Sequence, residues 1–406
     1  MNSYKNIMKR AVCILLFCCL ISSPQSNCQD IIKPVNQIPI LAWYSIPPEQ
    51  TSMARYLELK ESGITHNLSF FNDAESMSGA LDTAWKAGIK MIVYCPELKT
   101  ATEMTVKRFM NHPAVAGYML RDEPNRSDFS ELAEWAKKIQ ATDNRHFCYL
   151  NLFPNYASEE QLGTKTYQEH VDLFVREVPV QFISFDHYPV LGDSLRANWY
   201  ENLEIISGAA RNADKPFWAF ALSVAHSKFP IPTLAQLRLQ VFSDLAYGAQ
   251  GIQYFTYWTP FDTTWSFNNG PVALDGKRTV VYDRIREVNK EIVSLSNVFS
   301  GAKVISVSHT GLIPQGTRPL TELPKPIRIL KTEGTGAVVS YLENGTSSYL
   351  VIVNRDFKKQ MTLYIECEKN VNKVFKDGSS TPANAYQSRT EIDQGDIAIY
   401  SWITDK

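Results

Sequence analysis

The chain has 406 residues, 12% of them aromatic, and 41 basic side chains against 42 acidic ones give a formal net charge of −1. This near-neutral balance, without a basic tract, argues against nucleic acid as the main partner. The length is large for a single hydrophobic core, so more than one structural unit is expected.

The first 29 residues have the layout of a secretory signal. Three basic residues precede the apolar run 11–21, and residues 22–30 are small and polar. We therefore expect an exported protein, in the periplasm or at the cell surface. Later apolar runs are too short to span a bilayer, so membrane attachment is expected only through a lipid on Cys28. Whether that lipid is present is left open, because no clear small aliphatic pattern precedes Cys28.

Residues 35–298 alternate apolar runs and amphipathic segments with a period of roughly thirty residues, the length of one βα unit. Glycines at 63 and 88 match helix ends, and Thr233–Gln236 has the form of a capping box. An open doubly wound sheet shares this alternation, but no glycine-rich phosphate loop follows the first strand. We therefore predict a closed (β/α)8 barrel. Its eight strands are expected at 39–46, 65–71, 90–95, 115–121, 146–153, 182–188, 217–223 and 251–258.

Residues 301–406 have a different pattern, with short alternating strands separated by Asn-Gly, Asp-Gly and Gly-Asp turns. This predicts a small antiparallel β-sandwich with a supporting or carbohydrate-contacting role. Its strands are expected at 304–308, 336–342, 348–353, 360–366, 371–375 and 396–402.

In a parallel barrel the residues that follow each strand meet at one rim, where active sites are built. Here they combine carboxylates, amides and aromatic rings, a mixture that suits a sugar. The candidate sugar-binding residues are Trp43, Tyr44, Glu97, Asp122, Asn151, His187, Tyr188, His226, Tyr257 and Trp258.

Glu123 is the candidate general acid. The apolar strand from Val115 ends in Arg121, Asp122, Glu123 and Pro124, and proline stops the ladder at that point. Asp122 would raise the pKa of Glu123 by like-charge repulsion. Arg121 would lower that pKa, or it could instead pair with Asp122. The alternative is an acidic pair that merely complements a helix dipole.

Asp186 is the candidate second carboxylate, because Phe182–Pro189 repeats the order of apolar run, polar cluster and proline. Two carboxyl groups perform glycosidic cleavage in most glycosidases. Asp186 could instead orient Tyr188 or His187, or bond to His187 in a purely structural role.

Metal and cofactor chemistry is not expected. Cys95, Cys148 and Cys367 lie in unrelated contexts, and the histidines at 66, 187 and 226 lack ligand-like spacing. A metal-dependent hydrolase is therefore the weakest of the functional hypotheses, and no disulfide framework is predicted.

Arg121–Pro124 resembles the Asn-Glu-Pro motif at the fourth strand of the clan A glycoside hydrolases, with Asp122 in place of Asn. The segment Leu245–Trp258 is similar to the last helix and strand of family 42 β-galactosidases. The stretches Tyr349–Arg355 and Gly395–Tyr400 are similar to the β domains appended to such barrels, as in the β-galactosidase-like hydrolases exported by gut Bacteroidetes. The resemblance implies a (β/α)8 barrel, a carbohydrate substrate and Glu123 as the acid.

One position departs from the clan A pattern. That clan places a nucleophilic Glu at the end of the seventh strand, where Phe217–His226 contains no carboxylate. Asp186 could supply the missing group, with Glu97 or Asp262 as substitutes, or a substrate group held by an Asp and a Tyr could replace it. The remaining alternative is a non-catalytic surface glycan-binding protein on a degenerate barrel.

Overall fold

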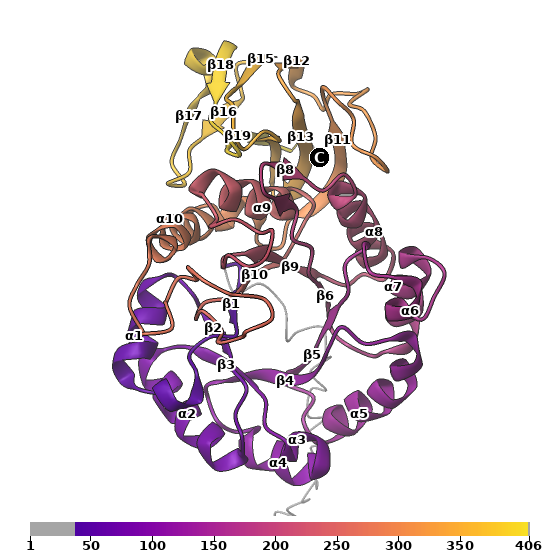
Figure 1. Ribbon diagram of the computed structural model, residues 1–406. Helices are drawn as coiled ribbons and strands as arrows, with labels where there is room; N and C mark the ends of the chain where they lie inside the picture. The colour runs from indigo at the N-terminus through magenta and orange to yellow at the C-terminus, as the bar shows by residue number, and fades with distance from the viewer. Residues whose placement is uncertain (1–36, 405–406) are drawn as a thin grey trace, which may run out of the picture.

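The computed structural model describes residues 37–404, so the predicted secretory signal and the lipid on Cys28 lie outside the described residues. Eight parallel strands form a closed barrel in the order β1-β10-β9-β6-β5-β4-β3-β2 (Figure 1). The predicted barrel is therefore confirmed. Its strands are β1 (Ile40–Trp43), β2 (His66–Leu68), β3 (Lys90–Val93), β4 (Val115–Asp122), β5 (Phe147–Leu152), β6 (Ile183–Phe185), β9 (Phe217–Leu222) and β10 (Gly251–Phe255).

Helices surround the barrel and follow the strands in the expected alternation. Gly88 ends α2 with a left-handed φ of 77°, which glycine adopts without steric cost. Thr233 begins α9 with the predicted capping box. The helices are α1 (Met53–Glu61), α2 (Ala74–Ala87), α3 (Glu97–Thr100), α4 (Thr102–Phe109), α5 (Phe129–Thr142), α6 (Glu159–Leu162), α7 (Tyr167–Glu177), α8 (Trp199–Asn212), α9 (Leu234–Ala246), α10 (Val280–Ser294) and α11 (Ser296–Phe299). A short hairpin, β7 (Val190–Leu191) and β8 (Ser194–Leu195), follows β6.

The C-terminal part consists of two antiparallel sheets, which confirms the predicted sandwich. One has the order β11-β13-β14-β19-β16-β17 and the other β12-β15-β18. Alternate side chains of both sheets pack into a shared core that includes Leu350, Leu363 and Tyr400. The strands are β11 (Lys303–His309), β12 (Ile327–Glu333), β13 (Ala337–Asn344), β14 (Ser347–Asn354), β15 (Met361–Cys367), β16 (Asn372–Val374), β17 (Ser380–Pro382), β18 (Ser388–Ile392) and β19 (Ile397–Ile403). The sequence analysis missed β12, β17 and β18.

The outer face of the six-stranded sheet packs on the barrel, and its apolar residues, such as Val351 and Val353, join the core of the barrel. Gly395 has a φ of +65° and lies so close to α9 that an added Cβ would come within 2.1 Å of the Ala235 carbonyl oxygen. Arg238 of α9 reaches Asp396 of the sandwich at 3.8 Å. The barrel and the outer face of the six-stranded sheet therefore share one hydrophobic core, beside the separate core between the two sheets.

Within residues 37–404, no helix is both long and apolar enough to cross a bilayer. Cys95, Cys148 and Cys367 are all buried.

Candidate active site at the carboxyl end of the barrel

Asp122, Glu123 and Asp186 lie at the carboxyl ends of β4 and β6, with β5 between them. The register pairs Asp122 with Asn151 of β5, and Asn151 with Ser184 of β6, so these three residues share one level of the barrel. Glu123 follows directly, and its N–H donates to the Asn151 carbonyl at 2.8 Å. Its φ of 46° is in the left-handed region, which turns the chain sharply out of the strand.

A buried polar network fixes Asp122. Asn151 Nδ2 donates to Asp122 Oδ1 at 3.1 Å, and Ser184 Oγ donates to Asn151 Oδ1 at 2.8 Å. Gln253 Nε2 donates to Ser184 Oγ at 2.9 Å, and the Tyr149 hydroxyl donates to Gln253. The network joins four strands, and because these donors and acceptors satisfy one another away from water, they lock the amide of Asn151 toward Asp122.

Burial raises the pKa values of all three carboxyl groups, and neighbouring charges raise those of Glu123 and Asp186 further. Burial raises the pKa of Asp122 to about 6, against a lowering by the Asn151 amide. Burial and then the Asp122 charge raise the pKa of Glu123 to about 7. The pKa of Asp186 is well above its usual value because of burial and then the charges of Glu123 and Asp122. Near neutral pH the cluster therefore retains protons, as a general acid requires.

These groups are not sealed from solvent, and the Asp122 side chain is exposed while Glu123 and Asp186 are half-buried. The desolvation therefore comes from the concave wall around them rather than from full enclosure. Arg121 pairs with Asp128 at 3.4 Å, so the possible pairing with Asp122 is not formed.

Tyr188 lies beside the carboxyl groups. It is 7% exposed, and its hydrogen bond lowers the pKa of Asp186. Asp186 Oδ1, by contrast, is buried and has no hydrogen-bond partner within the described residues. An unpaired buried acceptor costs free energy until a donor arrives, so this oxygen is placed to accept a hydroxyl or other donor from a ligand.

Tyr156 is a further candidate that the sequence analysis missed. It lies in the loop after β5 with 37% of its surface exposed, and its ring contacts His187 at 5.0 Å. The Arg196 guanidinium stacks over it at 3.9 Å. Burial raises the pKa of its phenol, and Asp186 adds to this, which places the hydroxyl near the carboxyl cluster. The sequence signal that could have identified Tyr156 is its position, four residues after the end of β5.

Four other predicted residues form the wall of the site. Trp43 is 5% exposed, and its ring lies 5.8 Å from Tyr149. Tyr44 is half-buried. His187 is 1% exposed, and burial lowers its pKa to about 3, so it is a neutral imidazole. His226 is 7% exposed and is surrounded by aromatic rings.

The other three predicted sugar contacts interact with other parts of the protein. Tyr257 is completely buried and its ring faces Tyr282 of α10, because it points outward from the barrel. Trp258 is 3% exposed with Arg55 over its ring at 5.0 Å, which leaves no open face for a sugar. Glu97 accepts the Ala74 N–H at 3.2 Å, and backbone donors lower its pKa, so it acts as a cap.

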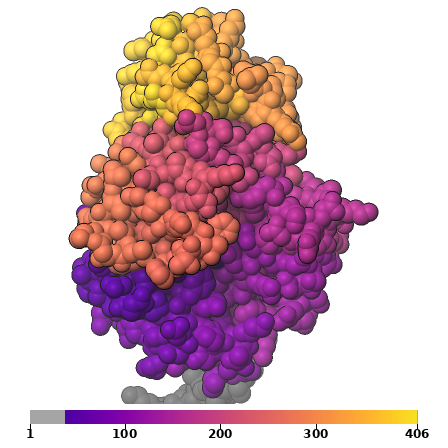
Figure 2. Space-filling model, viewed as in Figure 1, coloured from indigo at the N-terminus to yellow at the C-terminus, as the bar shows by residue number. Residues whose placement is uncertain are grey.

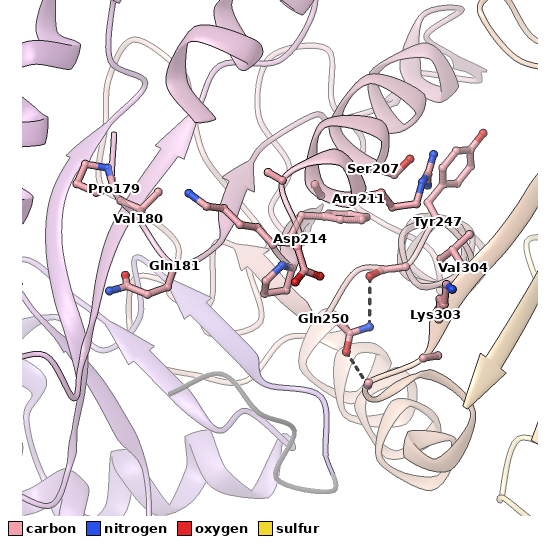
Figure 3. A pocket seen from close by; sticks show the side chains of 18 of the residues that line it. Pro179, Val180, Gln181, Ser207, Arg211, Asp214, Tyr247, Gln250, Lys303 and Val304 are labelled. Atoms are coloured by element: carbon pink, nitrogen blue, oxygen red, sulfur yellow. Dashed lines mark hydrogen bonds between the residues drawn. The ribbon is translucent and has the colours of Figure 1, made fainter. Parts of the chain in front are cut away.

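A cavity lies at the opposite end of the barrel. It has a volume of about 880 Å³ and is lined by residues that precede β6, β9 and β10, among them Gln181, Asp214 and Gln250 (Figure 3). Gln250 there donates to the Phe299 carbonyl at 3.1 Å and accepts from Gly301 N–H at 2.7 Å. This cavity is far from the carboxyl cluster, so we do not assign it to the chemistry.

Among residues 37–404, no group of three or more His, Cys, Asp or Glu side chains is arranged to hold a metal ion.

Comparison with known proteins shows a shared fold. The sequence matches no protein-family model and no curated protein. A GH42 beta-galactosidase from G. stearothermophilus has a TM-score of 0.65 and 9% identity, over 92% of this chain and 99% of that chain. A glycoside hydrolase family 5 protein from Bacteroides vulgatus ATCC 8482 has a TM-score of 0.57 and 10% identity, over 90% and 89%.

A beta-galactosidase from the psychrophilic Marinomonas ef1 has a TM-score of 0.50 and 11% identity, over 64% of this chain and 60% of that chain. The chain thus spans less than two thirds of that protein. These similarities confirm, at the level of fold, the expected resemblance to glycoside hydrolase barrels.

Proposed function

We propose that the protein is a glycoside hydrolase that cleaves an oligo- or polysaccharide by carboxylate acid/base catalysis. The observation that carries this proposal is the convergence of Asp122, Glu123 and Asp186, with raised pKa values, at the carboxyl end of a (β/α)8 barrel. Neighbouring acids with raised pKa values are characteristic of catalytic sites. The fold shared with glycoside hydrolases supports the same conclusion.

Glu123 is the general acid of this proposal. A pKa of about 7 keeps a large fraction of its carboxyl protonated at neutral pH, ready to protonate the glycosidic oxygen. Asp122 maintains that pKa through its charge, and Asn151 holds Asp122 in place.

Asp186 is the second carboxyl group. It lies across β5 from Glu123, and while Glu123 keeps its proton, the Glu123 charge that would raise the pKa of Asp186 is absent, which favours the ionised form of Asp186. It then acts either as nucleophile or as base toward water. Its unpaired Oδ1 leaves it free to take that role.

Export to the periplasm or cell surface is part of the proposal and rests on the sequence of the first 29 residues. Fractionation of cells that produce the full chain, with and without residues 1–29, tests it. Cytoplasmic retention of the full chain would contradict it.

The test of the activity is a panel of aryl-glycosides and polysaccharides, with the Glu123→Gln protein as control. Release of product by the wild type, and a marked loss in the variant, are expected. Turnover that is equal in both proteins would remove Glu123 from the acid role.

One observation favours a second candidate, a glycan-binding protein without activity. The end of β9 carries Ser223, whose hydroxyl donates to the Thr256 carbonyl at 2.7 Å, where clan A hydrolases have their nucleophile. Calorimetric binding of an oligosaccharide without any product release by the wild type would support this candidate.

A further inference from the structure

The segment between β10 and α10 carries exposed aromatic rings at the rim of the barrel. Figure 1 shows this segment running across β1 and β2, and Figure 2 shows it at the surface facing the viewer. Within it, residues 260–270 form what we call the aromatic loop. Phe261 is 80% exposed and Trp265 is 54% exposed, whereas Phe267 packs inward against His226 at 4.7 Å.

The aromatic loop is held by a dense set of hydrogen bonds. Asn268 and Ala225 exchange two backbone hydrogen bonds, at 2.9 and 3.0 Å, and Ser227 N–H donates to the Trp265 carbonyl at 3.2 Å. Asp262 Oδ1 accepts from Trp265 N–H at 2.8 Å. Trp265 is therefore presented to solvent by a fixed backbone, so that little conformational entropy is lost when a ligand covers its ring.

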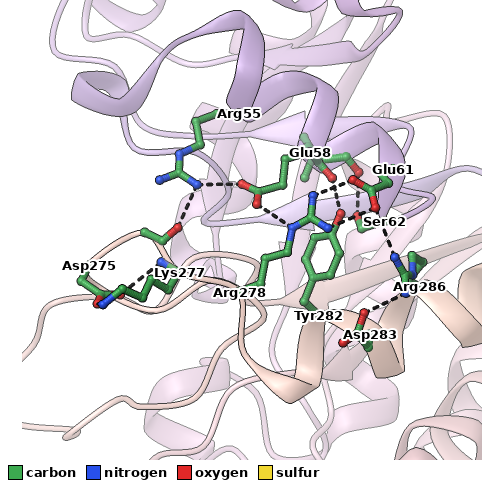
Figure 4. A network of polar contacts seen from close by, with 12 residues as sticks. Arg55, Glu58, Glu61, Ser62, Asp275, Lys277, Arg278, Tyr282, Asp283 and Arg286 are labelled. Carbon is green, nitrogen blue, oxygen red and sulfur yellow. Dashed lines mark hydrogen bonds and ion pairs between the residues drawn. The ribbon is translucent and has the colours of Figure 1, made fainter.

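The chain just after the aromatic loop is anchored to α1 by ion pairs (Figure 4). Arg278 contacts Glu61 at 2.5 Å and Glu58 at 2.8 Å, and Arg55 donates to the Gly276 carbonyl at 2.8 Å. Both ends of the segment are thus fixed to the barrel.

A continuous line of rings connects Trp265 to the carboxyl groups. Trp265 lies 6.4 Å from His226, and His226 lies 6.2 Å from Phe255. Phe255 stacks on Tyr188 at 5.5 Å, and Tyr188 is beside Asp186. These ring contacts place the exposed indole of Trp265 on the same rim of the barrel as the carboxyl groups, where one sugar chain can reach both.

We propose that Trp265 is a stacking platform for a pyranose ring of the substrate at a position beyond the sugar that is cleaved. The apolar face of a pyranose matches an exposed indole ring, and the distance along the line of rings leaves room for intervening sugar. This inference rests on the proposed function and deepens it, because it makes the substrate an oligo- or polysaccharide chain rather than a single sugar with a small aglycone.

Trp85 provides a matched control. It is 55% exposed, and its ring contacts His112 at 6.2 Å in the same edge-on manner as Trp265 contacts His226. It lies on α2, on the outside of the barrel. Substitutions at the two positions therefore remove the same exposed ring from different places.

The experiment is affinity electrophoresis of the Glu123→Gln protein through gels that contain arabinogalactan, galactomannan, xyloglucan or arabinoxylan. We expect at least one gel to retard this protein. Adding Trp265→Ala should weaken binding by about tenfold, Trp265→Phe should restore most of it, and Trp85→Ala should leave it unchanged. In the active protein, Trp265→Ala should raise KM for a tetrasaccharide, whereas Trp85→Ala should leave both this KM and kcat/KM for an aryl monoglycoside unchanged.

Several outcomes overturn the platform. The first is an equal loss of polysaccharide binding in Trp265→Ala and Trp85→Ala. The others are retardation that does not depend on Trp265, a lack of retardation in every gel, and a dimer that depends on Trp265 in size-exclusion chromatography. Failure of the proposed function gives a different result. If the gels retard the wild type in a Trp265-dependent manner but the wild type releases no product, the platform is supported and the hydrolase function is rejected. Turnover that is insensitive to Trp265 retains the hydrolase and removes the platform.

Discussion

Two arcs of the barrel rim carry different chemistry. The acidic arc, at the ends of β4 and β6, holds Asp122, Glu123 and Asp186. The aromatic arc, at the ends of β9 and β10, holds His226, Phe255, Phe267 and Trp265. Both arcs are built on the same closed sheet, but a side-chain polar network fixes the first, whereas backbone hydrogen bonds and ring packing fix the second. In the functions proposed above, the first arc carries bond cleavage and the second carries recognition of the sugar chain.

The largest effect is expected at Asp186. Asp186→Asn should reduce kcat by at least about a thousandfold, because an amide can neither attack the anomeric carbon nor deprotonate water. Glycan binding should survive, since the amide still donates and accepts hydrogen bonds. Product release and calorimetric binding on one oligosaccharide measure both, with Asp193→Asn on the exposed β7–β8 hairpin as control. A fully active Asp186→Asn protein would move the search for the second carboxylate to Glu97 and Asp262, whereas residual activity would indicate that Asp186 orients Tyr188.

The next effect concerns Glu123. Glu123→Gln should lower turnover by about a hundredfold or more on substrates with poor leaving groups and much less on activated aryl-glycosides, since only the former need protonation. In the wild type, activity should decline as pH rises through about 7, the pKa of Glu123. Steady-state kinetics on both substrate classes across pH measure this. Equal losses on the two classes would assign Glu123 a positioning role.

A smaller effect is expected from the network behind the acidic arc. Asn151→Ala removes the donor that lowers the pKa of Asp122, so that pKa should rise above about 6. With Asp122 less charged, the pKa of Glu123 should fall, and the alkaline limb of the pH–activity profile should move to lower pH. The profile of Leu57→Ala, a change at an exposed position of α1, is the reference. An unchanged pH–activity profile in Asn151→Ala would show that the polar network does not affect the pKa of Glu123.

The smallest effect is on stability. The folded-state pKa of Glu123, about 7, exceeds its ordinary value of 4.5, so the folded state binds the extra proton. Its contribution to stability is complete below about pH 4.5 and is lost as pH rises through about 7. Glu123→Gln should therefore gain stability relative to the wild type as pH increases, on the order of 1 kcal/mol at pH 8 after discounting for the partial exposure of Glu123. Urea unfolding at pH 5 and pH 8 measures this, and a pH-independent difference would contradict the raised pKa.

The sequence predicted the barrel well because each strand is an apolar run bounded by a turn signal. The strands that it missed, β12, β17 and β18, are all edge strands of the sandwich sheets. Edge strands bury few side chains, so their apolar alternation is weak; in β18, for example, only Ile392 is fully buried.

Pattern reasoning also found the acidic arc but not what holds it. Tyr149, Ser184 and Gln253 are single polar residues inside apolar strands, and Tyr149 lies 104 residues from its partner Gln253. A polar residue in a buried strand signals a hydrogen bond, but its partner depends on barrel closure. The burial of Tyr257 and Trp258 could not be predicted for a related reason, because the chain direction after β10 decides which side chains face the rim.

The packing of Gly395 against α9, together with the shared apolar core, has a consequence for how the molecule unfolds. Neither part has a complete surface of its own, so barrel and sandwich should melt as one cooperative unit rather than in sequence. A barrel shortened at Phe299 would expose the apolar residues of α9 that Val351 and Val353 cover, and would be prone to aggregation. The sandwich thus stabilises the barrel by covering part of its surface. Replacing either part with the corresponding domain of another protein should therefore destabilise the fold.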